Sequence, residues 1–343
     1  MSKRTLESFY KTVTPPKSKR LKAEETDISV ATSFSHHKNY PHPIATLPPS
    51  IATPLASIKD SASKKINDQP HLDLLYFHPL IPSATARDLF QFIRRELPFY
   101  RVQYTIQRFG KTTQIITPRF TTVFGVDATS LFVPDEQNEV KTEEAGSSAS
   151  PALKLVDAKT RKPIPDNKYQ YKPRPIPSCL DTLRRHVEAA QNDGSTYNFC
   201  LVNYYATGDD SISYHSDDER FLGKNPSIAS ISLGAQRDFL MRHKPSQDAG
   251  ISNQPMKFPL ASGDMIVMRG ETQSNWLHSI PKRKGGEAHK GRINITFRKA
   301  VVAGGTNNYY NYNVGSGIVY RWDEGEGKMV AQVKKEADGE TDS

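Results

Sequence analysis

The sequence predicts a mainly β fold with flanking helices, built on a double-stranded β-helix (jelly-roll) core. Two observations predict this class. Short segments that alternate apolar and polar residues follow one another through the second half of the chain, as half-buried antiparallel strands do. Turn sequences separate these segments, namely TGDD, LGKNP, ASGD and KGGE. Closely spaced short strands with such turns are typical of jelly rolls.

The elements before these strands complete the expected fold. An apolar run at 72–77 predicts the first strand, and RDLFQFIRREL at 87–97 predicts a helix that Ser83 or Thr85 would cap. The apolar residues of this helix fall at helical spacing: Leu89, Phe92, Ile93 and Leu97. A second helix is predicted at 178–190, with the core face Leu180, Leu183 and Val187. Both helices are expected to buttress the strands.

The composition limits the class of protein. A chain of 343 residues has room for one domain of about 200 to 250 residues plus tails. Its net charge of +9 favours a polyanionic partner. Two cysteines, Cys179 and Cys200, provide no disulfide framework, which indicates a reducing compartment. No apolar run approaches the ~18 residues of a membrane helix and no signal-peptide core is present, so we expect a soluble intracellular monomer without membrane contact.

The charge divides the chain into regions. Residues 1–70 carry 11 basic against 6 acidic residues and many prolines, which predicts a disordered basic arm. Residues 301–343 carry 4 basic against 7 acidic residues and predict a largely disordered acidic tail. The folded domain is therefore expected at 71–300, where a nucleic-acid surface should lie. A stretch at 134–177, rich in charge, Ser and Pro, predicts an inserted loop within it.

One metal-binding pattern stands out in the second half of the chain. In an extended segment, His215 and Asp217 point to the same face because strand side chains repeat every two residues. His278, in WLHSIP, lies 63 residues further on and could complete a triad of two imidazoles and one carboxylate. Such a triad leaves coordination positions open on iron. Alone the pattern is weak, since a chance His-x-Asp with a later His is common.

The segment RINITFR at 292–298 predicts a strand with one packed face and one face that lines a site. Its polar face holds Arg292, Asn294, Thr296 and Arg298. Its apolar face holds Ile293, Ile295 and Phe297. Two inward guanidiniums are costly unless anions meet them, and a dicarboxylate supplies two. The alternative is a solvated basic face.

Several of these segments occur together and in a familiar order. NYYATGDDSISYHSDDE at 203–219, SIASISLGAQRDF at 227–239, WLHSIP at 276–281 and RINITFR resemble the AlkB family of iron and 2-oxoglutarate dependent nucleic-acid demethylases. The resemblance runs from about residue 74 to 299. Several independent motifs at compatible spacings make a chance match improbable.

The resemblance implies the cofactors and the residues that hold them. Iron(II) would be bound by His215, Asp217 and His278, with 2-oxoglutarate and O2 as co-substrates. Tyr205 and Arg292 would hold the distal carboxylate of 2-oxoglutarate. Three further residues would surround its iron-chelating end: Asn203, Asn294 and Arg298.

The activity that the resemblance implies is oxidative demethylation of 1-methyladenine and 3-methylcytosine in single- or double-stranded DNA. This is a direct-reversal repair of alkylation damage that releases formaldehyde, succinate and CO2. Three alternatives stay open: an RNA demethylase of the same fold, a protein hydroxylase, and a nucleic-acid-binding module that has lost catalysis.

The acidic pair after the metal motif is expected at the substrate. Both methylated bases are cationic, so a carboxylate prefers them to the neutral parent bases. By the family pattern Asp218 accepts from an exocyclic amine, Glu219 orients its neighbours, and Arg119 belongs to a lid facing the base. The alternative is that the two carboxylates are simply solvated.

A duplex substrate would need further apparatus, because a methyl group on the Watson-Crick edge is hidden until the base is extruded. Arg108-Phe109-Gly110-Lys111 resembles the family hairpin that inserts an aromatic into the vacated gap. The alternative is an ordinary hairpin turn. An aromatic opposite His215 is expected to stack on the flipped base, and three are candidates: Phe132, Tyr169 and Tyr171.

The N-terminal arm carries two targeting patterns. Leu6, Phe9 and Tyr10 have the spacing of the box that docks on the sliding clamp PCNA as a single helical turn, although Lys3 stands where Gln is usual. The cluster KSKRLK at 17–22 resembles a nuclear-localisation signal. We therefore expect a nuclear protein with the clamp as a possible partner. The alternatives are random aromatics and a solvated basic run.

Overall fold

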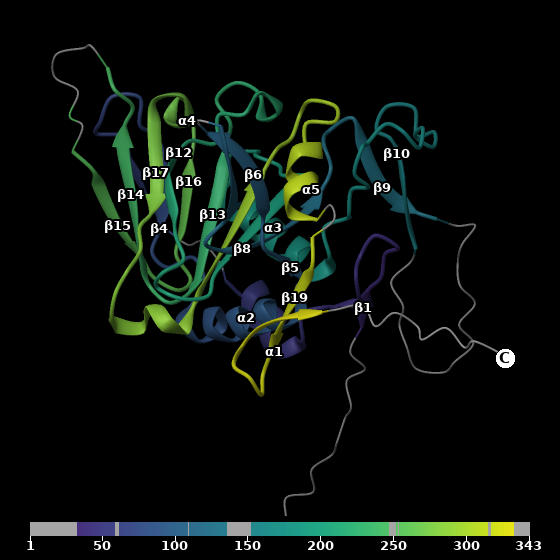
Figure 1. Cartoon of the computed structure of the whole chain (residues 1–343), viewed down its shortest axis with the longest axis horizontal. Coiled ribbons are helices and arrows are strands. Elements are labelled where there is room, and N and C mark those ends of the chain that lie inside the picture. Colours follow the sequence, from purple (N-terminus) through teal and green to yellow (C-terminus); the bar gives the residue numbers. More distant parts are fainter. Residues whose placement is uncertain are drawn as a thin grey trace, which may run out of the picture. The chain divides into compact units, whose positions relative to one another are not determined.

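Two antiparallel sheets form the centre of the chain (Figure 1). The structure is a computed structural model that describes residues 33–58, 62–108, 110–135, 152–246, 252, 254–314 and 317–332. The larger sheet has the strand order β20 (Lys328–Gln332), β19 (Val319–Asp323), β5 (Phe99–Tyr100), β8 (Phe120–Gly125), β11 (Phe199–Tyr205), β18 (Arg292–Arg298), β13 (Ile228–Gly234), β16 (Met265–Met268), β4 (Leu74–Phe77) and β3 (Ser63–Ile66). The smaller sheet has the order β12 (Ile212–His215), β17 (Trp276–Ile280), β14 (Arg237–His243) and β15 (Met256–Leu260). This arrangement confirms the predicted jelly-roll class.

Strand β18 lies between β11 and β13 in the larger sheet, and its alternation divides the core in two. Ile293, Ile295 and Phe297 join the apolar cluster under the helices. The intervening Arg292, Asn294, Thr296 and Arg298 therefore face the space between the two sheets, as the period-two pattern predicts. A second apolar cluster fills the rest of that space with residues from both sheets, including Phe239 and Trp276.

The two predicted helices cover the other face of the larger sheet. They are α2 (Ser83–Glu96) and α3 (Ser178–Gln191), and their apolar stripes are buried as expected. The predicted cap of α2 is wrong, because Ser83 is already the first helical residue and Pro82 precedes it without a side-chain cap. Thr85 is buried within the first turn instead. The described residues contain no helix long and apolar enough to cross a membrane.

The folded part begins earlier than the composition predicts. Residues 33–58 form β1 (Phe34–Ser35), β2 (Ile44–Ala45) and α1 (Pro49–Ala56), and α1 lies beside α2 in Figure 1. Ile44, Ile51 and Leu55 are buried in the cluster that also contains residues of α2 and α3. The prediction of a disordered arm is therefore wrong from residue 33 onward, since a few well-placed apolar residues suffice for docking. The clamp box and the basic cluster at 17–22 lie outside the described residues.

The predicted acidic tail is also folded over much of its length. After β18 the chain forms α5 (Asn307–Asn313) and the hairpin β19–β20, which extends the larger sheet beyond β5. The guanidinium of Arg94 on α2 lies 3.5 Å from the ring centroid of Trp322 on β19. This cation–π contact and the buried Tyr310 of α5 explain why a segment of low average hydropathy is ordered.

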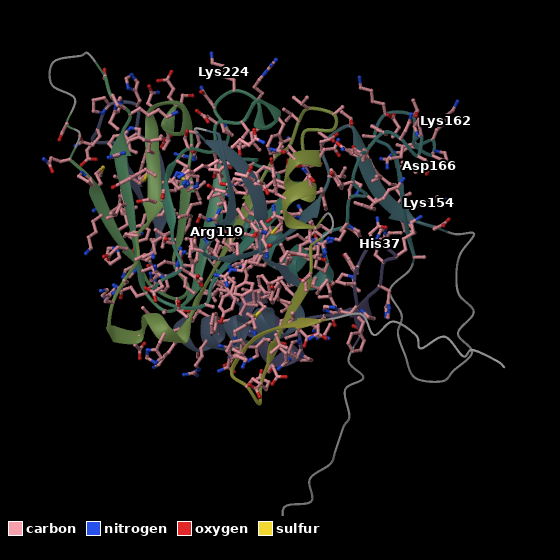
Figure 2. All side chains as sticks on the ribbon, in the orientation of Figure 1. His37, Arg119, Lys154, Lys162, Asp166 and Lys224 are labelled. Atoms are coloured by element: carbon pink, nitrogen blue, oxygen red, sulfur yellow. The ribbon has the colours of Figure 1, made fainter. Side chains whose placement is uncertain are left out.

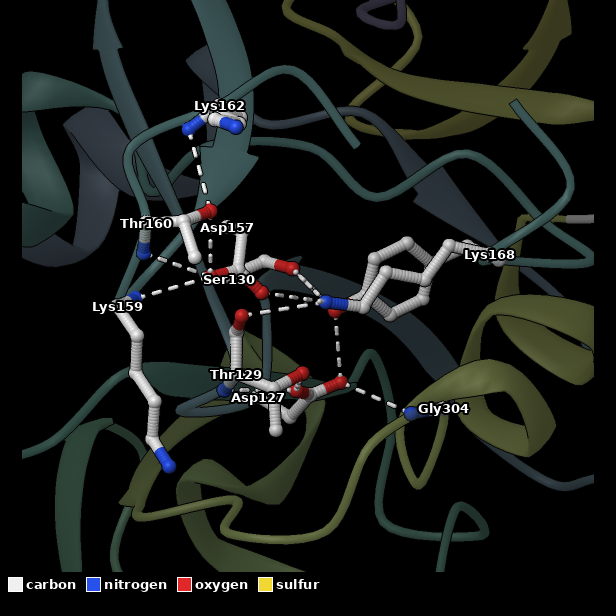
Figure 3. A network of polar contacts seen from close by, with 10 residues as sticks. Asp127, Thr129, Ser130, Asp157, Lys159, Thr160, Lys162, Lys168 and Gly304 are labelled. Atoms are coloured by element: carbon white, nitrogen blue, oxygen red, sulfur yellow. Dashed lines mark hydrogen bonds and ion pairs between the residues drawn. The ribbon is translucent and has the colours of Figure 1, made fainter. Parts of the chain in front are cut away.

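The predicted insertion contains a strand pair. β9 (Ser130–Pro134) pairs with β10 (Leu153–Asp157), and Figure 3 shows the polar network that holds the following segment. The ammonium group of Lys168 donates to the carbonyl oxygen of Thr129 (3.1 Å) and to Oγ of Ser130 (2.8 Å). The prediction of a loop is therefore wrong for residues 153–157.

The remaining elements are β6 (Gln103–Arg108), β7 (Lys111–Ile116), α4 (Thr272–Asn275) and the 3-10 turns Arg220–Leu222 and Gly286–Lys290.

Substitution within α1 tests whether residues 33–58 belong to the fold. Leu55→Ala should lower the free energy of unfolding by about 2 to 5 kcal/mol, because it leaves a cavity in the main core. Thr53→Ala, at an exposed position of the same helix, is the control and should change it by less than about 0.5 kcal/mol. Denaturant unfolding of both variants measures the difference. Equal stabilities would show that α1 does not dock.

Candidate active site

A cavity of about 320 Å³ lies between the two sheets and contains the predicted metal triad. The larger sheet contributes residues of β11, β13 and β18, and the smaller sheet contributes residues of β12, β14 and β17. The polar lining includes Arg119, Asn203, Tyr205, Glu219, Ser230, Arg292, Asn294, Arg298 and Tyr309. Apolar side chains complete the wall: Leu201, Ile212, Phe239, Met268 and Ile280.

His215, Asp217 and His278 converge in this cavity as the sequence predicts. His215 on β12 pairs in register with His278 on β17, and their ring centroids are 4.2 Å apart. The Nε2 atom of His215 is 4.0 Å from Oδ1 of Asp217, and Nε2 of His278 is 3.9 Å from Oδ2. Two ligands that each bond one ion at about 2.1 Å can be no more than about 4.2 Å apart. One ligand atom from each of the three residues lies within 4.8 Å of the other two, so small side-chain adjustments would let them share a single metal ion.

Hydrogen bonds orient two of the three ligands. The carbonyl oxygen of Ser213 can only accept, so Nδ1–H of His215 donates to it (2.9 Å) and Nε2 keeps its lone pair for the metal. The backbone N–H of Asp217 donates to Oε1 of Gln273 on α4 (2.8 Å), directly before the strand that carries His278. Gln273 therefore links the loop of one ligand to the strand of another.

The electrostatics keep Asp217 and His278 in their ligating forms. Burial alone would raise the pKa of Asp217, but Arg298 and the two histidines outweigh it and lower that pKa below its ordinary value. Nη2 of Arg298 donates to Oδ2 of Asp217 at 2.8 Å. Burial and the neighbouring His215 lower the pKa of His278 to about 3, so its ring is neutral at pH 7. A carboxylate and neutral imidazoles are the forms that bind iron(II).

Arg292 provides a second, anion-seeking end of the cavity. It is 1% exposed, and its Nη2 donates to Oγ of Ser232 at 2.8 Å. Its Nε and Nη1 have no hydrogen-bond partner among the described residues. Burial lowers the pKa of Arg292 to about 10, so the group stays charged at neutral pH. A buried cation with unpaired donors fits a carboxylate ligand.

The other predicted 2-oxoglutarate residues lie around Arg292. Tyr205 is its register partner on β11, and its ring centroid is 5.5 Å from the guanidinium. Asn203 pairs in register with Asn294, whose Nδ2 donates to Oγ of Ser230 (2.8 Å). These residues, Arg292 and Arg298 all line the cavity. The structure therefore brings together every residue predicted to hold the co-substrate.

Arg119 also reaches the cavity, from the segment before β8. Its Nε donates to Oδ1 of Asn203 at 3.0 Å, and Figure 2 shows it among the strands. Lys154, Lys162 and Lys224 lie at the periphery in the same view. Arg119, the predicted lid residue, therefore contacts one of the predicted 2-oxoglutarate residues, Asn203.

The acidic pair points in two directions. Glu219 lines the cavity, whereas Asp218 does not. The side chain of Asp218 is 50% exposed, and its Oδ2 accepts from the ammonium group of Lys244 at 2.8 Å. The structure therefore places Glu219 at the cavity, whereas the ion pair with Lys244 holds Asp218 outside it.

The three aromatics predicted to stack on a base do not line the cavity. Phe132 packs edge-on against His37, with ring centroids 5.6 Å apart. Tyr169 is buried, and its hydroxyl donates to Oδ2 of Asp127 (2.9 Å). Tyr171 packs against the apolar cluster between the sheets. The structure therefore places none of the three candidates at the cavity, and the stacking residue stays a prediction.

The described residues on either side of the predicted wedge form a hairpin, and they do not line the cavity. Strands β6 and β7 form a separate pair in which Arg108 opposes Lys111. Gly110 in the turn has φ +72°, a conformation that favours glycine, and Lys111 is exposed. Phe109, the proposed wedge itself, lies outside the described residues.

Four residues of the site were not found from the sequence: Ser230, Ser232, Gln273 and Tyr309. Ser230 and Ser232 alternate along β13, so the period-two pattern of SIASIS could have placed them on the cavity face. Gln273 and Tyr309 carry no such signal. They reach the site from short helices whose placement depends on tertiary packing.

Residues 73–298 match the 2OG-Fe(II) oxygenase superfamily, and the chain belongs to this family. The resemblance seen in the sequence is thereby confirmed. The family implies Fe(II) and 2-oxoglutarate as cofactor and co-substrate, with O2 as the second co-substrate. The donor set of the triad and the unpaired guanidinium of Arg292 fit both groups.

Individual relatives refine the comparison. The chain is 41% identical over 132 residues to a human protein named DNA oxidative demethylase ALKBH2, which covers 38% of this chain and 49% of that protein. It is 41% identical over 122 residues to human alpha-ketoglutarate-dependent dioxygenase alkB homolog 3, and this match covers 35% of this chain and 41% of that protein. The chain thus spans about half the length of these human relatives or less. An Arabidopsis thaliana DNA oxidative demethylase ALKBH2 is 27% identical over 290 residues, with 79% and 80% coverage.

Removal of the carboxylate ligand tests the metal site. Asp217→Ala should weaken Mn²⁺ or Fe²⁺ binding at least tenfold, since loss of one ligand leaves two imidazoles beside the uncompensated Arg298. Anaerobic metal titration of the purified variant measures this directly. Asp209→Ala removes an exposed carboxylate of the same segment and serves as the control. Unchanged metal affinity in Asp217→Ala, with the fold intact by circular dichroism, would refute the assignment.

Proposed function

We propose that this protein removes N-alkyl groups oxidatively from DNA bases, with 1-methyladenine and 3-methylcytosine as substrates. The observation that carries this proposal is that one cavity contains separate groups for a metal ion, an anionic co-substrate and a cationic base. The cavity holds the metal triad together with a buried guanidinium, Arg292, that has two unpaired donors, and a buried carboxylate oxygen without a partner among the described residues, Oε2 of Glu219. The guanidinium suits a dicarboxylate co-substrate, and the carboxylate oxygen suits a cationic base that carries an amino group. The names of the human and plant relatives agree with this class of substrate.

The chemistry of the reaction belongs to the cofactor and the co-substrates. Iron(II) bound by His215, Asp217 and His278, together with 2-oxoglutarate and O2, supplies the oxidation of a methyl C–H bond to a hydroxymethyl group. The hydroxymethyl base then releases formaldehyde, while 2-oxoglutarate leaves as succinate and CO2. The protein binds, orients and excludes water.

The chain's own residues provide this orientation. Arg292, beside Tyr205, would bind the distal carboxylate of 2-oxoglutarate, so the opposite end of that molecule faces the triad. Asn203 and Asn294 flank that end from neighbouring strands. Glu219, which lines the same cavity, would accept a hydrogen bond from the substrate base at Oε2. The apolar part of the wall limits water around the reacting methyl group.

The wider biological setting follows from segments outside the described residues. We infer a nuclear location from the basic cluster at 17–22 and docking on PCNA through Leu6, Phe9 and Tyr10. The basic balance of the chain supports a nucleic-acid partner. The Phe109 wedge, if present, would favour duplex DNA over single strands. RNA is the competing substrate, because the same cofactor chemistry and the same methylated bases could be used on RNA.

Substrate-driven turnover decides among these functions. Succinate and formaldehyde should form in equal amounts when the enzyme with Fe(II) and 2-oxoglutarate is given DNA containing 1-methyladenine or 3-methylcytosine. The matched unmethylated oligonucleotide is the control and should give little of either. The same lesions in single-stranded DNA, duplex DNA and RNA rank the substrates. Faster turnover on methylated RNA would favour the RNA demethylase, and no formaldehyde from any methylated oligonucleotide would refute the proposal.

A further inference from the structure

Helix α5 brings a tyrosine into the cavity from outside the region that matches the oxygenase family. The family match ends at Arg298, and α5 follows at Asn307–Asn313. Tyr309 of this helix lines the cavity. Its ring packs edge-on against Phe199, with centroids 5.4 Å apart, and against Phe221 at 5.7 Å. A segment beyond the catalytic domain therefore completes the wall of the site.

The next residue fixes the position of α5. Tyr310 is fully buried, and its hydroxyl donates to the carbonyl oxygen of Gly125 (2.7 Å) and accepts from the backbone N–H of Arg174 (3.0 Å). Just before the helix, the N–H of Gly304 donates to Oδ2 of Asp127 at 3.0 Å, as Figure 3 shows. These contacts hold α5 to the larger sheet independently of the hydroxyl of Tyr309.

The hydroxyl of Tyr309 bridges the metal ligands and the acidic residue of the cavity. It donates to Oε1 of Glu219 and accepts from Nη1 of Arg298 (2.7 Å). Arg298 in turn donates to Oδ2 of Asp217 at 2.8 Å. A continuous chain of hydrogen bonds therefore runs from the metal ligand Asp217 to Glu219.

This bridge leaves one oxygen of Glu219 free. Oε1 is occupied by Tyr309, whereas Oε2 is buried and has no hydrogen-bond partner among the described residues. A buried acceptor without a donor is unfavourable, so a ligand that donates a hydrogen bond is favoured there. The amino group of an adenine or a cytosine is such a donor. The carbonyl oxygens of a thymine are acceptors and would be repelled.

We infer that Tyr309 is a positioning residue for base selection, which holds Glu219 so that Oε2 accepts from the exocyclic amino group of the methylated base. This inference rests on the proposed function and adds the residue that sets its specificity. The aromatic ring alone would satisfy the packing against Phe199 and Phe221. Only the hydroxyl group connects Glu219 to Arg298, so its removal separates positioning from packing.

Binding without turnover tests the inference. The holoenzyme with Fe(II) and 2-oxoglutarate, kept anaerobic, is titrated by fluorescence anisotropy with single-stranded oligonucleotides. These contain one 1-methyladenine, one 3-methylthymine or no lesion. The preference for 1-methyladenine over 3-methylthymine is the measured quantity. Tyr309→Phe should reduce it about fivefold, the effect of one hydrogen bond.

Matched variants make the result specific. Tyr312→Phe removes a hydroxyl from the same helix at a position that is 46% exposed and should leave the preference unchanged. Glu219→Gln replaces the other partner of the Tyr309–Glu219 hydrogen bond and should also reduce the preference for 1-methyladenine. The double variant Tyr309→Phe/Glu219→Gln should then lose little more than Glu219→Gln alone, because the two residues act as a unit.

The outcomes separate the inference from the proposed function. If Tyr309→Phe keeps the wild-type preference for 1-methyladenine and Glu219→Gln loses it, the role of Tyr309 is overturned. The proposed function would still stand. Additive losses in the double variant would overturn it as well. A wild-type enzyme that binds the 1-methyladenine oligonucleotide no more tightly than the unmodified one would overturn the proposed function and the inference together.

Discussion

The buried ion pair between Arg298 and Asp217 is the interaction on which the rest of the site depends. Burial of a carboxylate without a cationic partner favours its protonated form, and a protonated carboxyl is a poor metal ligand. Arg298, 2.8 Å away and 3% exposed, keeps it ionised. The same guanidinium reaches Tyr309 on α5, so one residue of the central strand connects the metal ligand to the C-terminal segment.

Arg292 lies on the same face of the same strand, yet it is left without an acidic partner. The two buried guanidiniums of this strand thus differ. Arg298 is neutralised by Asp217, and Arg292 is free to bind an anionic ligand. A buried unpaired charge costs folding free energy, which a dicarboxylate co-substrate would restore on binding. Arg292 therefore differs from Arg298 in lacking a carboxylate partner among the described residues, and this difference favours an anionic ligand at Arg292.

The parts of the site that the sequence predicts are those governed by strand periodicity. Alternation in RINITFR places both arginines on one face. The His-x-Asp spacing keeps two ligands close along the chain, but Asp217 lies beyond the end of β12, where its backbone bonds Gln273 of α4. Glu219 could not be separated from Asp218 by pattern alone, since Lys244 decides which of them turns outward. Composition likewise overestimated disorder at both ends, because docking of α1 and α5 needs only a few buried residues, among them Leu55 and Tyr310.

A crystal structure of the enzyme with Fe(II) and 2-oxoglutarate, prepared without oxygen, tests the central claim most directly. The account predicts one metal ion bonded to Nε2 of His215, a carboxylate oxygen of Asp217 and Nε2 of His278. It also predicts the distal carboxylate of 2-oxoglutarate on the two donors of Arg292 that lack protein partners, Nε and Nη1. A metal ion held elsewhere, or a co-substrate that leaves Arg292 without an anion, would contradict it.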